Sequence, residues 1–120
     1  MKRSLKLSLG LACAALLVGV MPTSAAVPKL AGTVGPGFTI TLKKNGVRVT
    51  KLKAGRYTFT IRDRADVHNF ALIGPGLTRD LTSVAFVGTK TVTLRLRPGR
   101  YTYLCDPHAA DMSGTFRVVR

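Results

Sequence analysis

Three side chains with soft or borderline donor atoms lie close together near the end of this 120-residue chain. Cys105, His108 and Met112 offer a thiol, an imidazole and a thioether within eight residues. Calcium and magnesium prefer oxygen ligands, whereas a set with sulfur and imidazole donors suits a copper ion. The residue types and their spacing therefore predict a metal site on one short loop.

The remaining soft donors of the chain are few. It has two cysteines, two histidines and three methionines, and Cys13, Met1 and Met21 lie in an N-terminal segment with the pattern of a secretion signal. The rest of the chain then keeps one cysteine, one methionine and two histidines, of which the second is His68. Two imidazoles, one thiolate and a weak axial thioether are the ligand set of a blue-copper site.

These residues also stand in a recognisable order. The run Cys105-Asp-Pro-His-Ala-Ala-Asp-Met112, followed by Ser-Gly-Thr-Phe, and an upstream His68-Asn-Phe resemble the cupredoxin family, nearest to plastocyanin and pseudoazurin. The similarity covers about residues 29–120. It implies a Greek-key sandwich that binds one type 1 copper ion through His68, Cys105, His108 and Met112. Three residues separate His108 from Met112, fewer than in plant plastocyanin.

The resemblance also implies roles for neighbours of the ligands. Asn69 corresponds to the family's residue that ties the two ligand loops together by hydrogen bonding. Pro107 has no backbone N–H and cannot donate to the thiolate, which leaves the sulfur a stronger donor. We interpret Asp106 and Asp111 as turn or capping residues. A small apolar patch of Pro107, Ala109 and Ala110, joined by residues 74–77, is expected around the exposed edge of His108, where electrons enter.

The elements that must position these side chains begin after the signal. Residues 1–26 combine a charged start at Lys2, Arg3 and Lys6, a 14-residue apolar run and small residues for cleavage after Ala25 or Ala26. A bilayer span needs about 20 apolar residues, so a cleaved signal is favoured over an uncleaved anchor. We therefore expect residues 27–120 to form one secreted or periplasmic copper-binding domain without a transmembrane span.

The exported domain would have 16 Lys and Arg against five Asp, a net charge of +11. Outside the cell nucleic acid is an improbable target for this charge, so an acidic redox partner or an anionic envelope surface is favoured, with a merely solvated basic face as the alternative. Cys105 is left without a cysteine partner, and a bound metal would protect it from oxidation. An inert buried cysteine would not explain the neighbouring histidine and methionine.

Short alternating segments separated by turn signals fill the domain. Strands are predicted at 29–34, 38–42, 47–52, 56–61, 67–73, 89–96, 101–105 and 115–119, and Asn45-Gly46 predicts a tight hairpin turn. The segment from Leu77 to Gly88 shows no clear pattern. Seven or eight strands with no helix to cover them predict an all-β sandwich, and the pattern alone would equally allow an immunoglobulin-like domain.

The alternation also predicts which side chains face the core. The inward candidates are Ile40, Leu42, Val49, Tyr57, Phe59, Ile61, Phe70, Leu72, Val92, Leu94, Leu96, Tyr101, Tyr103, Phe116 and Val118.

Three functions fit these observations. The first is a monomeric electron carrier of the cell envelope that passes single electrons between partner proteins through type 1 copper. The second is a copper-binding or copper-delivery protein without a redox partner, and the third is a metal-free sandwich used in adhesion. The sequence shows no Ser-His-Asp set and no carboxylate pair, so we expect no enzyme activity.

Overall fold

The computed structural model of the protein describes residues 4, 8, 10–21 and 25–120. Within these residues the secondary structure consists of strands and one short 3-10 turn, η1 (Asp106–His108). The strands are β1 (Lys29–Val34), β2 (Ile40–Lys44), β3 (Val47–Arg48), β4 (Lys51–Lys53), β5 (Gly55–Asp63), β6 (Phe70–Gly74), β7 (Leu77–Thr82), β8 (Gly88–Leu96), β9 (Gly99–Leu104) and β10 (Ser113–Val119).

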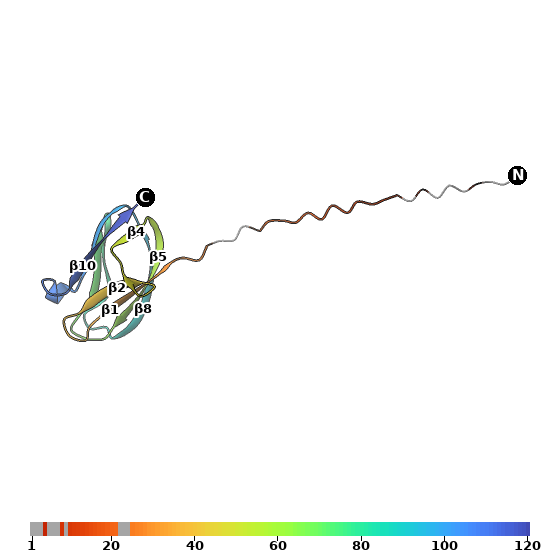
Figure 1. The fold of residues 1–120 in the computed structure, drawn as a ribbon. Helices are drawn as coiled ribbons and strands as arrows, with labels where there is room; N and C mark the ends of the chain where they lie inside the picture. Colours follow the sequence, from red (N-terminus) through yellow and green to blue (C-terminus); the bar gives the residue numbers. More distant parts are fainter. Residues whose placement is uncertain (1–3, 5–7, 9, 22–24) are drawn as a thin grey trace.

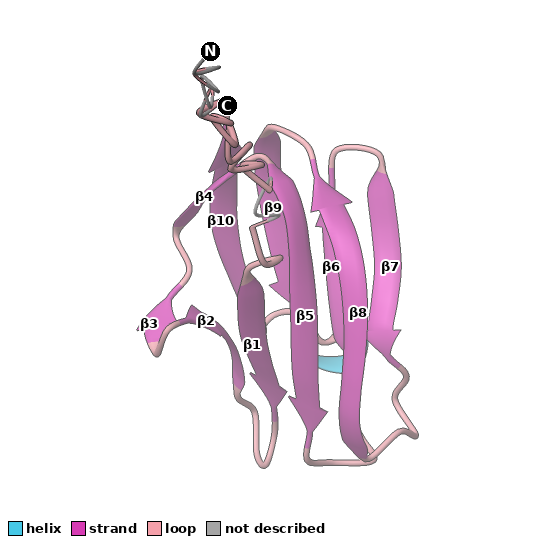
Figure 2. Cartoon of the chain, turned by 90° about the vertical axis from the view of Figure 1, so that its right-hand side faces the viewer, coloured by secondary structure: helices cyan, strands magenta, loops and turns pink. Residues whose placement is uncertain are grey.

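The strands form two five-stranded sheets, and Figure 2 shows one in front of the other. The first has the order β3-β2-β1-β5-β8, and the second has the order β4-β10-β9-β6-β7. Two pairs are parallel, β1 with β5 and β4 with β10, and the others are antiparallel. The mixed pairing and the crossovers between sheets confirm the predicted all-β Greek-key sandwich.

The structure has ten strands rather than seven or eight, and two places account for the difference. The segment predicted as one strand at 47–52 is two short strands, because the chain changes sheets at Val49 and Thr50. β3 pairs with β2 in the first sheet, whereas β4 pairs with β10 in the second. Both residues of β3 are exposed, and the buried residues Val49 and Leu52 are three positions apart, so the period of two expected of a single strand is broken at the crossing.

The other additional strand is β7, in the segment that showed no pattern. Its burial does not alternate: the first four residues are exposed or half-buried, and the last two, Leu81 and Thr82, are both buried. The pairing of β7 with β6 shifts register between Phe70 and Ala71. Such an irregularity breaks the period of two on which strand prediction depends.

The core lies between the sheets and agrees closely with the predicted one. Thirteen of the fifteen inward candidates are buried, and Ile40 and Val92 are partly buried against the others. The tyrosine Tyr101 is 1% exposed, and its hydroxyl donates to the backbone oxygen of Arg97 and accepts from the backbone N–H of the same residue, both at 2.9 Å. Tyr101 thereby satisfies the backbone at the corner between β8 and β9. The core also contains Leu30, Val34, Leu52, Leu81, Cys105 and Met112.

The N-terminal segment extends away from the sandwich (Figure 1). Its described apolar side chains are exposed, with Leu16 and Leu17 each more than 90% accessible. Among the described residues, no helix is both long and apolar enough to cross a bilayer. Lys2, Arg3, Lys6 and residues 22–24, on which the predicted signal partly depends, lie outside the described residues.

Candidate metal centre

Strand pairing brings the soft donors to one end of the sandwich. β6 pairs with β9 so that Ala71 faces Leu104, which places His68, just before β6, beside Cys105, just after β9. β10 pairs with β9 so that Ser113 faces Leu104, which returns Met112 to the same place. His108 ends the short turn η1 between them. We call this end of the molecule the His108 end.

Three donor atoms converge there. The Nδ1 atoms of His68 and His108 are 3.0 Å apart, and the Sγ atom of Cys105 lies 3.6 Å from the first and 3.7 Å from the second. The point equidistant from these three atoms is about 2.0 Å from each, close to the length of a metal–imidazole bond and slightly short of a metal–thiolate bond. The three side chains therefore fit one metal ion without rearrangement.

The site is shielded from water on most sides. Cys105 and Met112 are fully buried, His68 is 3% exposed, and His108 is half-buried. Two imidazole nitrogens 3.0 Å apart cannot both present lone pairs to each other, so a proton or a cation has to lie between them. A buried set of one thiol, one thioether and two imidazoles selects a soft or borderline cation over a hard one.

Backbone hydrogen bonds fix the loop that carries three of these side chains. The N–H of Cys105 donates to the carbonyl of Met112 at 3.0 Å, and the N–H of Met112 donates to the carbonyl of His108 at 2.8 Å. The N–H of His108 in turn donates to the carbonyl of Cys105 at 3.1 Å. The loop is therefore closed on itself, which holds its side chains in place before any ion binds.

Asn69 joins the two ligand segments. Its side chain is buried, its Oδ1 accepts from the backbone N–H of Asp106 at 2.7 Å, and its Nδ2 donates to the Asp106 carboxylate at 2.7 Å. This reciprocal pair connects the residue after His68 to the residue after Cys105. Asp106, interpreted from the sequence as a turn residue, is therefore also the partner of Asn69.

Two of the other carboxyl groups at this end, those of Asp63 and Asp80, have a raised pKa. Burial raises the pKa of Asp63, which ends β5, although hydrogen bonds from Thr82 and from the N–H of Ala65 oppose the rise. Its Oδ2 atom is buried without a hydrogen-bond partner. Although Asp80 has an exposed side chain, loss of water around its carboxyl and the adjacent Asp106 carboxylate raise its pKa.

The surface over His108 differs in part from the predicted one. Residues 74–77 were expected there, but they form the turn between β6 and β7 at the opposite end. β6 runs antiparallel to β9 and so ends where β9 begins, and a Cβ on Gly99 would meet Pro75. In their place Phe38 contacts both histidines, with ring centroids 4.8 Å from His108 and 5.8 Å from His68.

Phe38 is 62% exposed, and the sequence reasoning assigned it to a strand. The available signal was its position directly after Gly35-Pro36-Gly37, where two glycines have positive φ and the chain turns. A large aromatic residue next to such a turn is as readily a loop-tip contact as a strand residue.

Fold and donor set together define a cupredoxin-like sandwich. Neither a family model nor a curated protein sequence matches the chain. Among solved structures it resembles reduced rusticyanin, at 21% identity and a TM-score of 0.57, over 81% of this chain and 82% of that one. A second structure, of the copper protein rusticyanin, matches at 19% identity and a TM-score of 0.58, over 80% of each chain. A reduced amicyanin variant matches at 17% identity and a TM-score of 0.50, over 79% of this chain and 86% of that one.

Proposed function

We propose that this protein is an exported type 1 copper protein that carries single electrons between redox partners in the cell envelope. The proposal rests on the Nδ1 atoms of His68 and His108 and the Sγ atom of Cys105, which share one point that is about 2.0 Å from each of them. These donors lie in a sandwich of the cupredoxin type, where Cys105 and His68 are buried and His108 is half-buried. A bound copper ion would supply a one-electron couple between its cupric and cuprous forms.

The polypeptide would contribute a rigid arrangement of the four donor side chains. His68, Cys105 and His108 would be the strong ligands, and the buried thioether of Met112 the weak axial one. The loop hydrogen bonds and the pair formed by Asn69 fix these positions through elements of the second sheet. A prebuilt site changes little between oxidation states, so little reorganisation opposes an electron exchange.

The surroundings of the thiolate support an electron-rich sulfur. The N–H of Asp106 is already used by Asn69, and Pro107 has no N–H to give. Neither of the two residues after Cys105 therefore provides a backbone hydrogen bond that would withdraw charge from its sulfur. We assign Asn69 and Pro107 to this supporting role.

His108 would be the contact point with redox partners. It is the half-buried member of the donor set, and Phe38, Ala109 and Ala110 beside it are exposed. A small apolar surface lets two proteins approach closely with little desolvation cost. The amicyanin structures include both reduced and oxidised forms, which supports a redox role for this fold.

Voltammetry of the copper-loaded protein tests the carrier function directly. We expect a reversible one-electron wave that is lost in Cys105→Ser and retained in the control Asp111→Ala, an exposed loop residue. A protein that retains only cuprous ion and gives no reversible wave would instead be a copper-delivery protein. Failure to bind copper in either state would leave adhesion, the metal-free alternative.

Export is part of the proposal. The charged start, apolar run and small residues before Val27 support secretion or release into a periplasm, with a mature chain that starts at Ala26 or Val27. Mass spectrometry of the protein recovered from the envelope or medium checks the start site. A chain that still carries Met1 would contradict it.

The acidic partner predicted from the net charge stays a prediction. The five aspartates of the domain all lie at the His108 end, where Asp63, Asp66, Asp80, Asp106 and Asp111 stand on or next to the ligand segments. A partner that docks over His108 therefore meets mixed charge. We expect the apolar surface to contribute more than charge to that contact, and transfer rates to depend only weakly on salt.

A further inference from the structure

The basic residues of the domain gather at the end opposite His108. β1 and β5 run parallel to each other and end near His68, so both strands begin at the opposite end of the sandwich. β8 is antiparallel to β5 and therefore ends there. β9 begins at the same end, and β10, which is antiparallel to β9, ends there. Ten of the sixteen Lys and Arg of residues 27–120 lie there, and none of the five Asp does. We call these ten residues the basic pole. They are Lys29, Lys44, Lys51, Lys53, Arg56, Arg95, Arg97, Arg100, Arg117 and Arg120.

The basic pole brings like charges into direct opposition. On the first sheet Arg56 stands opposite Arg95. On the second sheet Arg117 stands opposite Arg100 on one side and Lys51 on the other, so three cations form a row across three strands. Like charges at directly opposed positions destabilise a sheet. The repulsion between these opposed cations lowers the stability of the sheets, and an anion bound from outside the protein would relieve it.

The His108 end shows the contrasting arrangement. Its cations include Arg62, Arg64 and Lys90. Of these, Arg62 and Lys90 face the neutral residues Thr89 and Ile61 across the β5–β8 pair. The acidic residues lie at the same end, so the local charges nearly balance. The molecule is therefore strongly polarised, with its positive field concentrated away from the metal centre.

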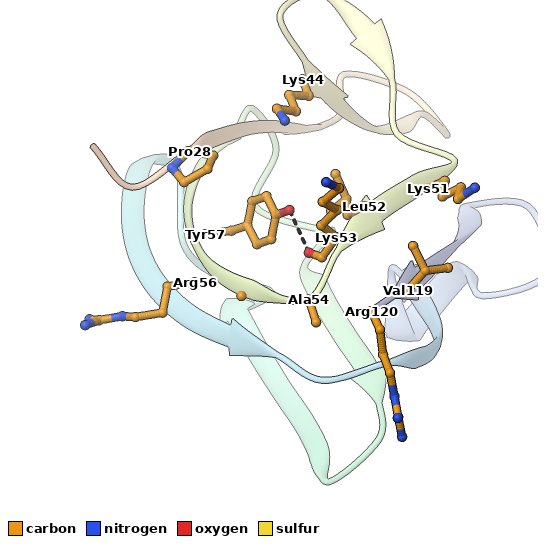
Figure 3. Close-up of a pocket in the computed structure, with 11 residues that line it drawn as sticks. Pro28, Lys44, Lys51, Leu52, Lys53, Ala54, Arg56, Tyr57, Val119 and Arg120 are labelled. Atoms are coloured by element: carbon orange, nitrogen blue, oxygen red, sulfur yellow. Dashed lines mark hydrogen bonds between the residues drawn. The ribbon is translucent and has the colours of Figure 1, made fainter. Parts of the chain in front are cut away.

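A wide, open cavity of about 880 Å³ lies in the basic pole. Figure 3 shows five of its cations, which come from strands of both sheets and from the C-terminus, spread around Tyr57. The hydroxyl of Tyr57 is already bonded to the backbone oxygen of Lys53 at 2.7 Å. Because Lys51, Arg56 and Arg120 point outward in different directions (Figure 3), the five cations do not all converge on one point, and the surface suits an extended anionic plane better than a single small anion. These cations are Lys44, Lys51, Lys53, Arg56 and Arg120.

The N-terminal segment enters the domain at this pole. Pro28 lines the cavity, and its carbonyl accepts from the N–H of Thr58 near the start of β5. The exposed apolar residues 11–21 precede it in the chain and are expected to be removed with the signal, so the basic pole itself has to supply the contact with lipid. Clusters of Lys and Arg next to an apolar segment are attracted to anionic lipid headgroups.

We propose that the basic pole binds the surface of an anionic phospholipid bilayer. Bound in this way, the protein lies with the His108 end turned away from the lipid and open to soluble or membrane-bound partners. The attachment uses none of the side chains of the metal centre and does not depend on copper.

The test is a vesicle co-sedimentation assay with the metal-free domain of residues 27–120. Vesicles of phosphatidylcholine with about one third phosphatidylglycerol are compared with pure phosphatidylcholine, at low salt and at about 1 M salt. The pole variant combines Lys51→Gln, Lys53→Gln and Arg56→Gln. The matched control combines Arg62→Gln, Arg64→Gln and Lys90→Gln, which removes the same charge from exposed positions at the other end.

We expect the wild type and the control to bind the anionic vesicles at low salt, and both to be released at high salt. The pole variant should bind about 10- to 100-fold more weakly, because each headgroup contact of a basic residue contributes several-fold. Thermal unfolding of both variants checks that they fold.

Three results would overturn the proposal. Equal losses in the two variants would mean that net charge alone drives adsorption. Equal binding to neutral vesicles would mean that the contact is not electrostatic. Saturable binding of inorganic phosphate without binding to vesicles would make the pole a site for a free anion instead.

Discussion

Replacement of Asn69 by alanine in the metal-free protein tests how firmly the two ligand segments are joined. The buried amide of Asn69 makes two hydrogen bonds of 2.7 Å with Asp106, one to a backbone N–H and one to a carboxylate. A neutral bond contributes about 1 kcal/mol and a bond to a charged group about 1.5–3 kcal/mol, so the loss should be about 2–4 kcal/mol. The contact with Asp80, at 3.4 Å, adds little.

Urea unfolding of the metal-free protein measures this loss. With a slope of about 2 kcal/mol per molar urea, the middle of the usual range, the midpoint should fall by about 1–2 M while the slope stays unchanged. Asp106→Ala removes only the carboxylate bond and keeps the backbone one. The double variant should therefore show a coupling energy of about 1.5–3 kcal/mol between the two side chains.

Asp111→Ala is the matched control, because it removes an exposed aspartate from the same loop. We expect it to change stability by less than about 0.5 kcal/mol. If Asn69→Ala costs no more than this control, or if the effects of Asn69→Ala and Asp106→Ala are simply additive, the two side chains do not hold the ligand segments together.

Three further predictions concern the core, the buried carboxyl and the axial position. Tyr101→Phe removes a hydroxyl that bonds both backbone groups of Arg97 and should destabilise the fold by about 1–3 kcal/mol in urea unfolding; an unchanged midpoint would show that the corner needs no hydroxyl. Burial raises the pKa of the Asp63 carboxyl in the folded state, so ionisation of this carboxyl lowers the stability of the fold as the pH rises through that pKa. Below about pH 4 the carboxyl is protonated in both the folded and the unfolded protein. Asp63→Asn should therefore raise the melting temperature at neutral pH and lose this advantage in acid; a gain that is equal at both pH values would contradict the assignment. Met112→Leu should leave the colour of the copper-loaded protein and shift its potential upward, because a weak donor that favours the oxidised ion is lost; an unmoved potential would exclude Met112 as a ligand.

The sandwich could be predicted from the sequence because most strands alternate cleanly. Lys29–Val34 has the predicted bounds, and Asn45 and Gly46 have positive φ at the hairpin turn. The change of sheet near Val49 was missed because 47–52 was interpreted as one strand, although its apolar residues Val49 and Leu52 are three positions apart and so break the period of two. β7 was missed because its burial is irregular where the pairing with β6 shifts register.

The donor set could be predicted because soft donors are rare in this chain. One thiol, one thioether and two imidazoles remain after Val27, and the structure brings the thiol and both imidazoles within reach of one ion. The surface over His108 could not be predicted in the same way. Whether Phe38 or residues 74–77 lie beside that histidine depends on the direction in which each strand runs between the two ends.

The distribution of charged residues over the surface could not be predicted from the sequence either. A net charge of +11 for residues 27–120 favoured an acidic redox partner or an anionic envelope surface, but the total charge says nothing about where on the surface the cations lie. Only the strand pairing shows that Arg100, Arg117 and Lys51 form one row, at the end away from His108. That row and the aspartates around the donor set place most of the positive charge away from the donor set.

The visible spectrum after addition of cupric ion tests the central claim most directly. We expect one equivalent of copper to give the wild type an intense thiolate-to-copper band, and we expect Cys105→Ser to lack it, because a hydroxyl cannot supply the charge-donating sulfur. Asp111→Ala should keep the band. A wild-type protein that shows only weak d–d absorption, or a Cys105→Ser variant that stays blue, would contradict a type 1 copper site built on this residue.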